Sequence, residues 1–355
     1  MNNDRIQEIL DLMEEARLDY FLISDPQSIA YCTGYYNDPH ERMFVFMISK
    51  HGNHTLFMND LFYLDHDLDV NIVWHKDGQD AIQTIVDEMH FPGRIGIDKN
   101  WASHFLLDLM KKLPDAKYIN ASPCVDLVRM KKDLQEQVVM IESSKINDAV
   151  MEEIIPFIQE GVTEKQLAKK LDELFFNHHS TCYGAIVAFG KNAADPHHEN
   201  DDTPLRKGDC VLIDMGCVYK GYCSDMTRTF FYEGILEEEI KVYEIVKKAN
   251  EAAEAMIKPG VKLSDIDKCA RKVISDEGYG KYFTHRLGHF IGRDVHEYGD
   301  VSSVNEMEVE EGMIFSIEPG IYLEGNFGVR VEDLVMVTKD GCQVLNSFTK
   351  DIYII

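Results

Sequence analysis

The sequence predicts an α/β domain followed by an α+β domain, and three observations indicate this. The chain has 355 residues, which is more than one small core accommodates and about the size of two domains. Over roughly the first hundred residues, short apolar runs typical of strands alternate with apolar residues at helical spacing. Beyond about residue 129, long helical patterns flank a strand-rich stretch, so the fold class changes there.

The N-terminal part is predicted to be a small domain with a mixed or partly parallel sheet. Apolar residues at helical spacing between Ile6 and Met13 predict the first helix, and the run Tyr20–Ile23 predicts the first strand. We then expect strands at 43–48 and 55–58, a helix at 81–89, a strand at 94–97 and a helix at 102–113. No cluster of catalytic side chains stands out in this part.

A long helical pattern begins near Arg129 and opens the C-terminal part. Its apolar positions are Leu134, Val138, Met140, Ile141, Ile146, Val150 and Ile154. Thr163 and Gln166 predict a capping box at the start of the next helix. Further helices are expected at 238–257 and 264–277. We therefore expect the boundary between about residues 122 and 132, giving domains 1–125 and 126–355.

The composition is acidic, with 36 lysine and arginine residues against 62 aspartate and glutamate residues and a net charge of -26. This balance opposes binding to nucleic acid and to anionic lipid, because both favour a basic surface. The sequence has no secretory signal and no apolar run of about 18 residues that could span a membrane. The scattered cysteines form no Cys-x-x-Cys pair, which indicates reduced thiols in a cytoplasmic protein.

Two aspartates interrupt apolar, strand-like sequence. Asp214 follows Val211-Leu212-Ile213, and Asp225 comes eleven residues later in Ser224-Asp225-Met226-Thr227. A hairpin that turns near Lys220-Gly221 brings the two carboxylates together. Paired carboxylates in an apolar sheet repel each other unless a cation joins them. No lysine or arginine lies next to Asp214, so we expect that cation to be a metal.

Three further motifs carry groups that bind or orient metals. In the segment 285–297, Gly288 and Gly292 predict an extended or tightly turned chain that presents His289 and His296 separately. Glu318 ends the apolar run 313–317 and precedes a Pro-Gly turn. In Gly328-Val329-Arg330-Val331-Glu332, the strand period places Arg330 and Glu332 on one face, where Arg330 can orient a carboxylate beside a metal.

Together these motifs supply four carboxylates and one imidazole. Such an oxygen-rich set suits Mn²⁺, Co²⁺ or Zn²⁺ in a two-metal site better than a thiolate zinc site. Two cations about 3.5–4 Å apart can polarise a carbonyl oxygen and supply a nucleophile at neutral pH. The sequence therefore predicts a site for two divalent ions in each subunit, with Mn²⁺ as the expected metal and Co²⁺ and Zn²⁺ as alternatives.

The order Asp, Asp, His, Glu, Glu resembles that of the pita-bread metallopeptidases, peptidase family M24B, which include prolidase and aminopeptidase P. The resemblance rests on the motifs around Asp214, Asp225, His289, Glu318 and Glu332, and it covers the whole chain. It implies a creatinase-type N-terminal domain followed by a pita-bread catalytic domain. It also implies that all five residues bind metal and that Asp225 and Glu332 bridge both ions.

The resemblance further implies roles in catalysis. Glu318 would also carry the proton of a hydroxide that bridges the metals, His197 would lie near the scissile bond, and His296 would stabilise the tetrahedral intermediate. The family analogy also implies a homodimer and a small peptide as substrate.

One loop looks like that of bacterial Xaa-Pro dipeptidases of the lactic-acid type. It contains Asp38 and His40 in Asn37-Asp38-Pro39-His40-Glu41-Arg42. Position 293 is Arg and position 290 is Phe, where many relatives have an apolar residue and glycine. We expect the ring and the cation to narrow the pocket, and Arg293 to pair with a carboxylate of the substrate or of the loop, such as that of Asp38.

The predicted activity is hydrolysis of dipeptides whose second residue is proline. Aminopeptidase P activity on longer Xaa-Pro peptides is the first alternative. A creatinase-like amidinohydrolase and a metal-free binding module are alternatives from other classes, and the complete ligand set argues against both.

Overall fold

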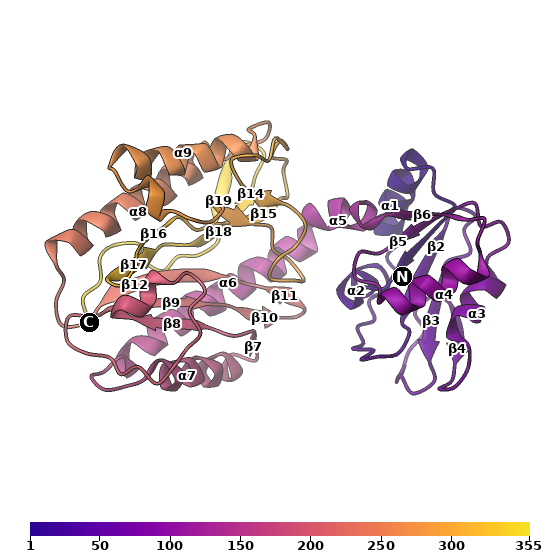
Figure 1. Cartoon of the computed structure of the whole chain (residues 1–355), viewed down its shortest axis with the longest axis horizontal. Helices are drawn as coiled ribbons and strands as arrows, with labels where there is room; N and C mark the ends of the chain where they lie inside the picture. Colours follow the sequence, from indigo (N-terminus) through magenta and orange to yellow (C-terminus); the bar gives the residue numbers. More distant parts are fainter. The chain divides into compact units, whose positions relative to one another are not determined.

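The computed structural model describes residues 1–355, and the chain divides into two compact units, Met1–Arg129 and Met130–Ile355 (Figure 1). The N-terminal unit contains the helices α1 Asn3–Glu15, α2 Pro26–Thr33, α3 Ala81–Glu88, α4 Ser103–Lys112 and α5 Ser122–Met130, the last of which ends one residue into the next unit. Its strands are β1 Tyr20–Ile23, β2 Val45–Ser49, β3 Thr55–Asn59, β4 Asn71–His75, β5 Arg94–Ile97 and β6 Lys117–Asn120.

These six strands form one mixed sheet in the order β4-β3-β2-β1-β5-β6. β1 pairs with β5 in parallel and with β2 in antiparallel fashion, which confirms the mixed sheet that the sequence predicts. Alternate residues of β1 pack into two different hydrophobic cores, one on each face of the sheet. Phe21 and Ile23 pack with apolar residues of α1, α2 and α5, while Tyr20 and Leu22 pack with those of α3 and α4. The sheet is therefore the middle layer between two layers of helices.

The sequence analysis missed β4, β6 and α2. β4 and β6 are the two edge strands, and most of their residues are only partly buried or exposed, so they lack a continuous apolar run. α2 is short and buried almost throughout, so it shows no amphipathic period. Its start is nevertheless marked by the cap of Asp25 on the backbone of Ser28 and by Pro26 in the first turn.

The C-terminal unit contains four long helices and five small sheets. The helices are α6 Leu134–Ile154, α7 Glu164–Asn177, α8 Glu237–Met256 and α9 Leu263–Asp276, with short 3-10 turns η1 Ile155–Phe157, η2 Gly190–Ala194 and η3 Gly280–Tyr282. The strands are β7 Thr181–Cys182, β8 Ile186–Phe189, β9 Cys210–Met215, β10 Cys217–Tyr219, β11 Tyr222–Cys223, β12 Met226–Phe231, β13 Gly288–His289, β14 Asp300–Val301, β15 Ile314–Ile317, β16 Gly320–Leu323, β17 Phe327–Arg330, β18 Asp333–Val337 and β19 Cys342–Val344.

Every pairing between named strands of this unit is antiparallel, as expected of an α+β domain. Figure 1 shows the strands between two pairs of helices, with α6 and α7 on one side and α8 and α9 on the other. The core of β8, β9 and β12 packs on α6 and α7. This layered arrangement holds the strand ends that carry the site.

The helical pattern predicted from about Arg129 is the helix α6, which begins only at Leu134, and the sequence analysis also missed α5 before it. α5 ends at Met130, and Asp133 begins α6 with a capping box in which Asp133 and Glu136 bond each other's backbone. Two apolar residues that the pattern counted, Leu134 and Val138, are exposed rather than buried. The capping box predicted at Thr163 and Gln166 is confirmed at the start of α7.

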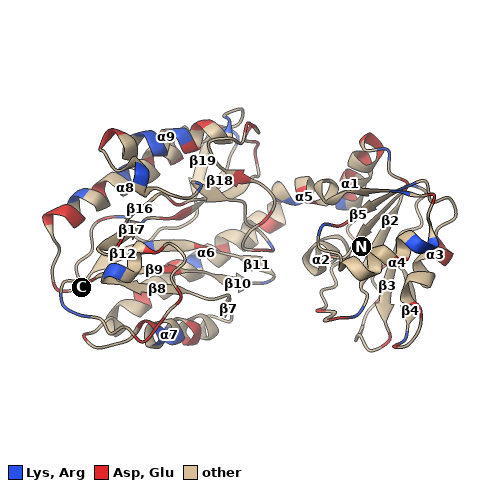
Figure 2. Cartoon of the chain, viewed as in Figure 1, with Lys and Arg blue, Asp and Glu red and all other residues tan.

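Acidic residues are spread over both units (Figure 2). The large negative charge is therefore a property of the whole surface and does not by itself mark the site. None of the helices is both long and apolar enough to cross a membrane.

Candidate active site

The two aspartates lie on a hairpin, as predicted. β9 pairs with β12, with Asp214 opposite Thr227, and Asp225 immediately precedes β12. Lys220 and Gly221 both have positive φ, 50° and 81°, which is the backbone of a type I′ turn between β10 and β11. The sheet thus places both carboxylates at one end of its strands.

Glu332 joins this hairpin from a distant part of the chain. Its backbone pairs with Thr227, whose hydroxyl donates to Glu332 Oε2 at 2.6 Å. The same hydroxyl accepts from Arg330 Nε at 3.1 Å, and Arg330 Nη2 donates to Asp214 Oδ2 at 2.6 Å. Thr227 therefore orients a carboxylate and an arginine together, a role that the sequence analysis did not assign.

Arg330 corrects one sequence-based inference. No cation lies next to Asp214 in the sequence, but the fold places the Arg330 guanidinium against its carboxylate across 116 residues. Arg330 was predicted to orient a carboxylate, and the carboxylate that it contacts is that of Asp214. The other three carboxylates receive no lysine or arginine contact, so the argument for a metal rests on them.

His289 and Glu318 complete the group through a close approach of two strands. A Cβ on Gly288 would lie 1.9 Å from the carbonyl oxygen of Ser316, so only glycine fits there. The Ser316 hydroxyl accepts from the His289 backbone at 3.0 Å and donates to Glu318 Oε1 at 3.1 Å. His289 Nε2 lies 3.6 Å from both Asp225 Oδ2 and Glu318 Oε1.

These residues fit a divalent cation. Asp225, His289 and Glu332 are at most 5% exposed, and each offers a ligand atom within 4.8 Å of the others. An N- and O-donor set at this spacing is what Mn²⁺, Co²⁺ or Zn²⁺ binds. Asp214 and Glu318 line the same cavity beside them.

Burial dominates the electrostatics of this group. It raises the pKa of Asp225 and of Glu332 well above the usual range, and the neighbouring carboxylates raise both further. Burial also raises the pKa of Glu318 to about 7 and lowers that of His289 to about 3. Without metal, burial therefore favours the protonated forms of Asp225, Glu318 and Glu332 and the neutral imidazole of His289. Bound cations would displace protons from these carboxyls.

Three more histidines line the cavity, namely His197, His285 and His296. The rings of His289 and His296 are in edge-to-face contact with centroids 4.2 Å apart, so the expectation that they are presented separately was wrong. The segment between them folds back on itself, with Gly292 bonding to Asp294 and Glu297 bonding to Phe290. A turn of this kind gives no periodic pattern of apolar residues in the sequence.

The sequence analysis assigned His285 no role. Its Nε2 lies 2.8 Å from the Tyr322 hydroxyl, which accepts from Arg330 Nη1 at 3.0 Å. Burial, assisted by the charge of Arg330, lowers the pKa of His285 to about 4. A hydrogen-bonded chain thus connects His285 through Tyr322 and Arg330 to Asp214. The sequence feature that could have identified His285 is its position four residues before His289 in the same motif.

The cavity has a volume of about 480 Å³, within the range of small-molecule sites. It is lined by Tyr183, Gly184, Ile186, Pro196, His197, Asp214, Asp225, His285, Arg286, His289, Val295, His296, Glu318, Arg330 and Glu332. Arg293 is not among these residues, and its guanidinium lies 5.3 Å from the centre of the Tyr222 ring. Asp38 and His40 belong to the N-terminal unit, where both are exposed and His40 bonds to Asp38.

A second cluster with metal-ligand chemistry consists of Glu164, His198 and Asp201. The fully buried carboxylate of Glu164 already accepts from the backbones of Phe189 and Asp201 and from the side chains of Asn192 and His198. Its oxygens are thus satisfied by protein donors, and the cluster ties the segment 189–201 to α7. We interpret it as structural.

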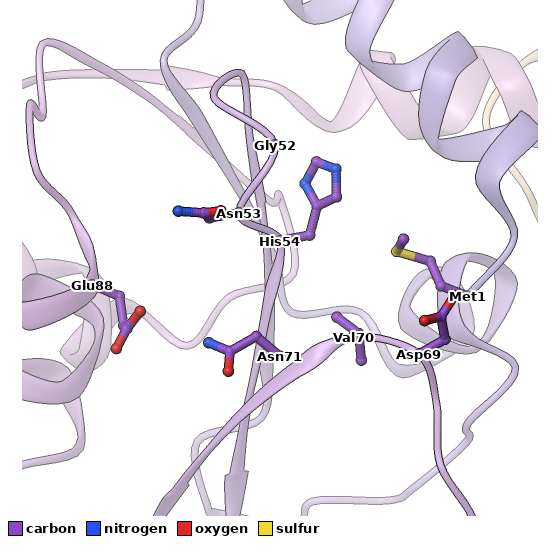
Figure 3. A pocket seen from close by; sticks show the side chains of 8 residues that line it. All are labelled: Met1, Gly52, Asn53, His54, Asp69, Val70, Asn71 and Glu88. Carbon is purple, nitrogen blue, oxygen red and sulfur yellow. The ribbon is translucent and has the colours of Figure 1, made fainter.

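A second cavity, of about 400 Å³, lies in the N-terminal unit. It is lined by Met1, Gly52, Asn53, His54, Asp69, Val70, Asn71 and Glu88. Figure 3 shows these side chains spread around the hollow rather than converging on one point. No metal-ligating cluster lies there, so this cavity offers no comparable chemistry.

Comparison with known proteins follows the same division of the chain. The sequence model of the creatinase/prolidase N-terminal domain matches residues 5–131, and that of metallopeptidase family M24 matches residues 139–339. An uncharacterized peptidase of Staphylococcus aureus is 34% identical over 98% of this chain and 99% of its own.

Two solved structures cover nearly the whole chain. Prolidase from Thermococcus sibiricus has a TM-score of 0.93 at 31% identity, covering 100% of this chain and 99% of its own. The X-Pro aminopeptidase from Thermotoga maritima has a TM-score of 0.85 at 29% identity, covering 97% and 100%.

The fold and the site define a metallopeptidase with a creatinase-type N-terminal domain and a pita-bread catalytic domain. The chain belongs to metallopeptidase family M24. This confirms the family, the fold class and the enzyme class that the sequence predicts.

Proposed function

We propose that this enzyme is an Xaa-Pro dipeptidase that hydrolyses dipeptides ending in proline with the help of two divalent ions. The observation that carries the proposal is the convergence of Asp225, His289 and Glu332 within 4.8 Å on a cavity also lined by Asp214 and Glu318. The likeness to a prolidase over the full length supports the substrate class. These five residues would hold the ions.

In the proposed mechanism, bound cations would polarise the scissile carbonyl and lower the pKa of a water. Glu318, which lines the cavity beside His289, would take the proton of the attacking water and pass it to the proline nitrogen. His197 and His296 line the cavity, where they would contact the scissile bond and the developing oxyanion. Arg330 would hold Asp214 in place through its 2.6 Å bond.

The test is hydrolysis of Leu-Pro, Leu-Pro-Pro and Leu-Leu by chelator-stripped protein with and without Mn²⁺. Cleavage of Leu-Pro alone, and only with metal, supports the dipeptidase. Cleavage of Leu-Pro-Pro supports the alternative, an Xaa-Pro aminopeptidase, which the likeness to the Thermotoga maritima enzyme favours. Cleavage of none of the three refutes both.

Metal addition is expected to stabilise the chelator-stripped protein. At a metal concentration of about 100 Kd the gain is about 2.7 kcal/mol in the free energy of unfolding. The gain falls as pH drops below about 7, because Glu318 then holds a proton that metal must displace. Melting curves with and without Mn²⁺ at pH 7.5 and 5.5 measure both effects, and equal shifts at the two pH values would refute the linkage.

Arg293 is proposed to pair with a carboxylate of the substrate. Arg293→Ala then raises KM for Leu-Pro by roughly two- to five-fold, the effect of losing one partly exposed ion pair. Steady-state kinetics measures this, and an unchanged KM would remove Arg293 from the site.

The metal, location and assembly are also proposals. We propose Mn²⁺ as the metal because the donor set is rich in oxygen, a cytoplasmic location because the cysteines are reduced and scattered, and a homodimer by family analogy. Elemental analysis of the purified protein, cell fractionation and sedimentation equilibrium test the three in turn.

A further inference from the structure

Asn250 is a fully buried polar side chain on α8, and it does not line the active-site cavity. Its Nδ2 donates to the carbonyl oxygen of Ile317 at 2.9 Å and, more weakly, to that of Val331 at 3.5 Å. In the sequence, the residues that carry these carbonyls immediately precede Glu318 and Glu332. One amide therefore joins the two segments of backbone that present these proposed metal ligands.

The orientation of this amide is fixed by its other partner. Lys350 Nζ donates to Asn250 Oδ1 at 2.7 Å, and an ammonium group can only donate. The amide oxygen must therefore face Lys350, which leaves the two hydrogens of Nδ2 for the two carbonyls. Lys350 is itself held by both carboxylate oxygens of Glu254, at 2.7 and 2.8 Å, and pairs with Asp333 at 2.7 Å. These contacts hold the Asn250 side chain in one position.

The two proposed ligands lie in a gap between two strand ladders. β15 pairs with β18 as far as Ile317, and β16 pairs with β17 from Gly320 onwards. Across the gap, the backbone of Val331 donates to the carbonyl oxygen of Pro319 at 3.4 Å, which is long for a hydrogen bond between backbone groups. The sheet by itself therefore holds the two segments together weakly at this point, and the amide of Asn250 adds two bonds that span them.

We propose that Asn250 is a positioning residue that fixes the separation of the Glu318 and Glu332 backbones and so the geometry of the metal site. This inference rests on the metal ligands of the proposed function and does not depend on the choice of substrate. Side chains that orient metal ligands without touching the metal contribute about 10- to 100-fold to metal affinity or activity. Asn250 acts on two ligands at once, so its loss is expected to weaken metal binding.

The test is the variant Asn250→Leu, which keeps the approximate shape of the side chain and removes both donors. Calorimetric titration of chelator-stripped protein with Mn²⁺ alone is expected to give a Kd raised by about 10-fold or more. At saturating Mn²⁺, kcat for Leu-Pro should fall while KM changes little, because Asn250 lies outside the cavity. A residue that only supported the fold would not change the affinity for the metal in a protein that remains folded.

Two further variants control for stability and for charge. Ile274→Ala removes a fully buried side chain from α9, which packs against α8, and so lowers stability without removing a hydrogen bond to either ligand segment. It should keep the wild-type Kd for Mn²⁺. Asn250→Asp still accepts from Lys350, but an ionised carboxylate has no hydrogen to donate to the carbonyls, so it should weaken Mn²⁺ binding as Asn250→Leu does. Urea unfolding identifies the variants that fold, and Asn250→Asp decides the question if Asn250→Leu does not.

The outcomes separate this inference from the proposed function. If the wild type binds Mn²⁺ and a folded Asn250 variant binds it with the same Kd, the inference is overturned and the metal site stands. Equal weakening in Ile274→Ala would also overturn it, because any loss of stability would then weaken metal binding. If the wild type itself binds no Mn²⁺, the proposed metal site is wrong, and the inference is overturned with it.

Discussion

Asp225→Asn is expected to lower kcat for Leu-Pro by more than about 100-fold, since losing even a supporting contact of a metal ligand costs 10- to 100-fold. Asp225 is buried, lies 3.6 Å from His289 Nε2 and offers one of the three convergent ligand atoms. Asparagine keeps the shape of the side chain but removes the negative charge that a shared cation requires. The variant should also lose most of the stabilisation that Mn²⁺ gives the wild type.

The same variant should leave the metal-free protein nearly as stable as the wild type. Burial and the neighbouring carboxylates raise the pKa of Asp225 well above its usual range, so the metal-free site favours its neutral form. Asparagine imitates that neutral form. Melting curves in chelator and in excess Mn²⁺, with Asp276→Asn on the surface of α9 as control, measure both states. A large loss of stability in chelator would mean that Asp225 supports the fold rather than a metal.

The hairpin beneath the candidate site, which the sequence predicted correctly, has local signals. Asp214 and Asp225 interrupt apolar strands around a turn, and the spacing and the Lys220-Gly221 pair predict the hairpin that the structure contains. The mixed sheet of the first unit follows from runs such as Tyr20–Ile23, which are buried on both faces.

The parts that it missed depend on contacts between distant segments. Thr227 meets Glu332 across 105 residues, and Arg330 meets Asp214 across 116, so neither partner is visible in the sequence around the other. The contact of the His289 and His296 rings depends on an irregular turn without a period. The exposure of Leu134 and Val138 shows the same limit, because an apolar residue at helical spacing does not reveal whether a neighbour covers it.

Gly288→Ala is expected to damage both stability and activity, although alanine adds only one methyl group. That methyl would lie 1.9 Å from the Ser316 carbonyl oxygen, a backbone atom that can move only if β13 separates from β15. We expect a loss of about 1–3 kcal/mol in the free energy of unfolding, as for other overpacked cores. The separation would also displace His289 and Glu318, because Ser316 Oγ bonds to the His289 backbone and to the Glu318 carboxylate.

Gly341→Ala is the matched control, since its added methyl would meet nothing closer than 3.9 Å and the backbone there is not left-handed. Urea unfolding of the two variants, together with kcat for Leu-Pro, measures the difference. If Gly288→Ala unfolded like the wild type but lost activity, the two strands would yield without unfolding and the glycine would serve mainly to place the ligands. If Gly288→Ala kept both the stability and the activity of the wild type, the close approach of the two strands would be unnecessary. The bonds of Ser316 to His289 and Glu318 then could not be what aligns the metal ligands.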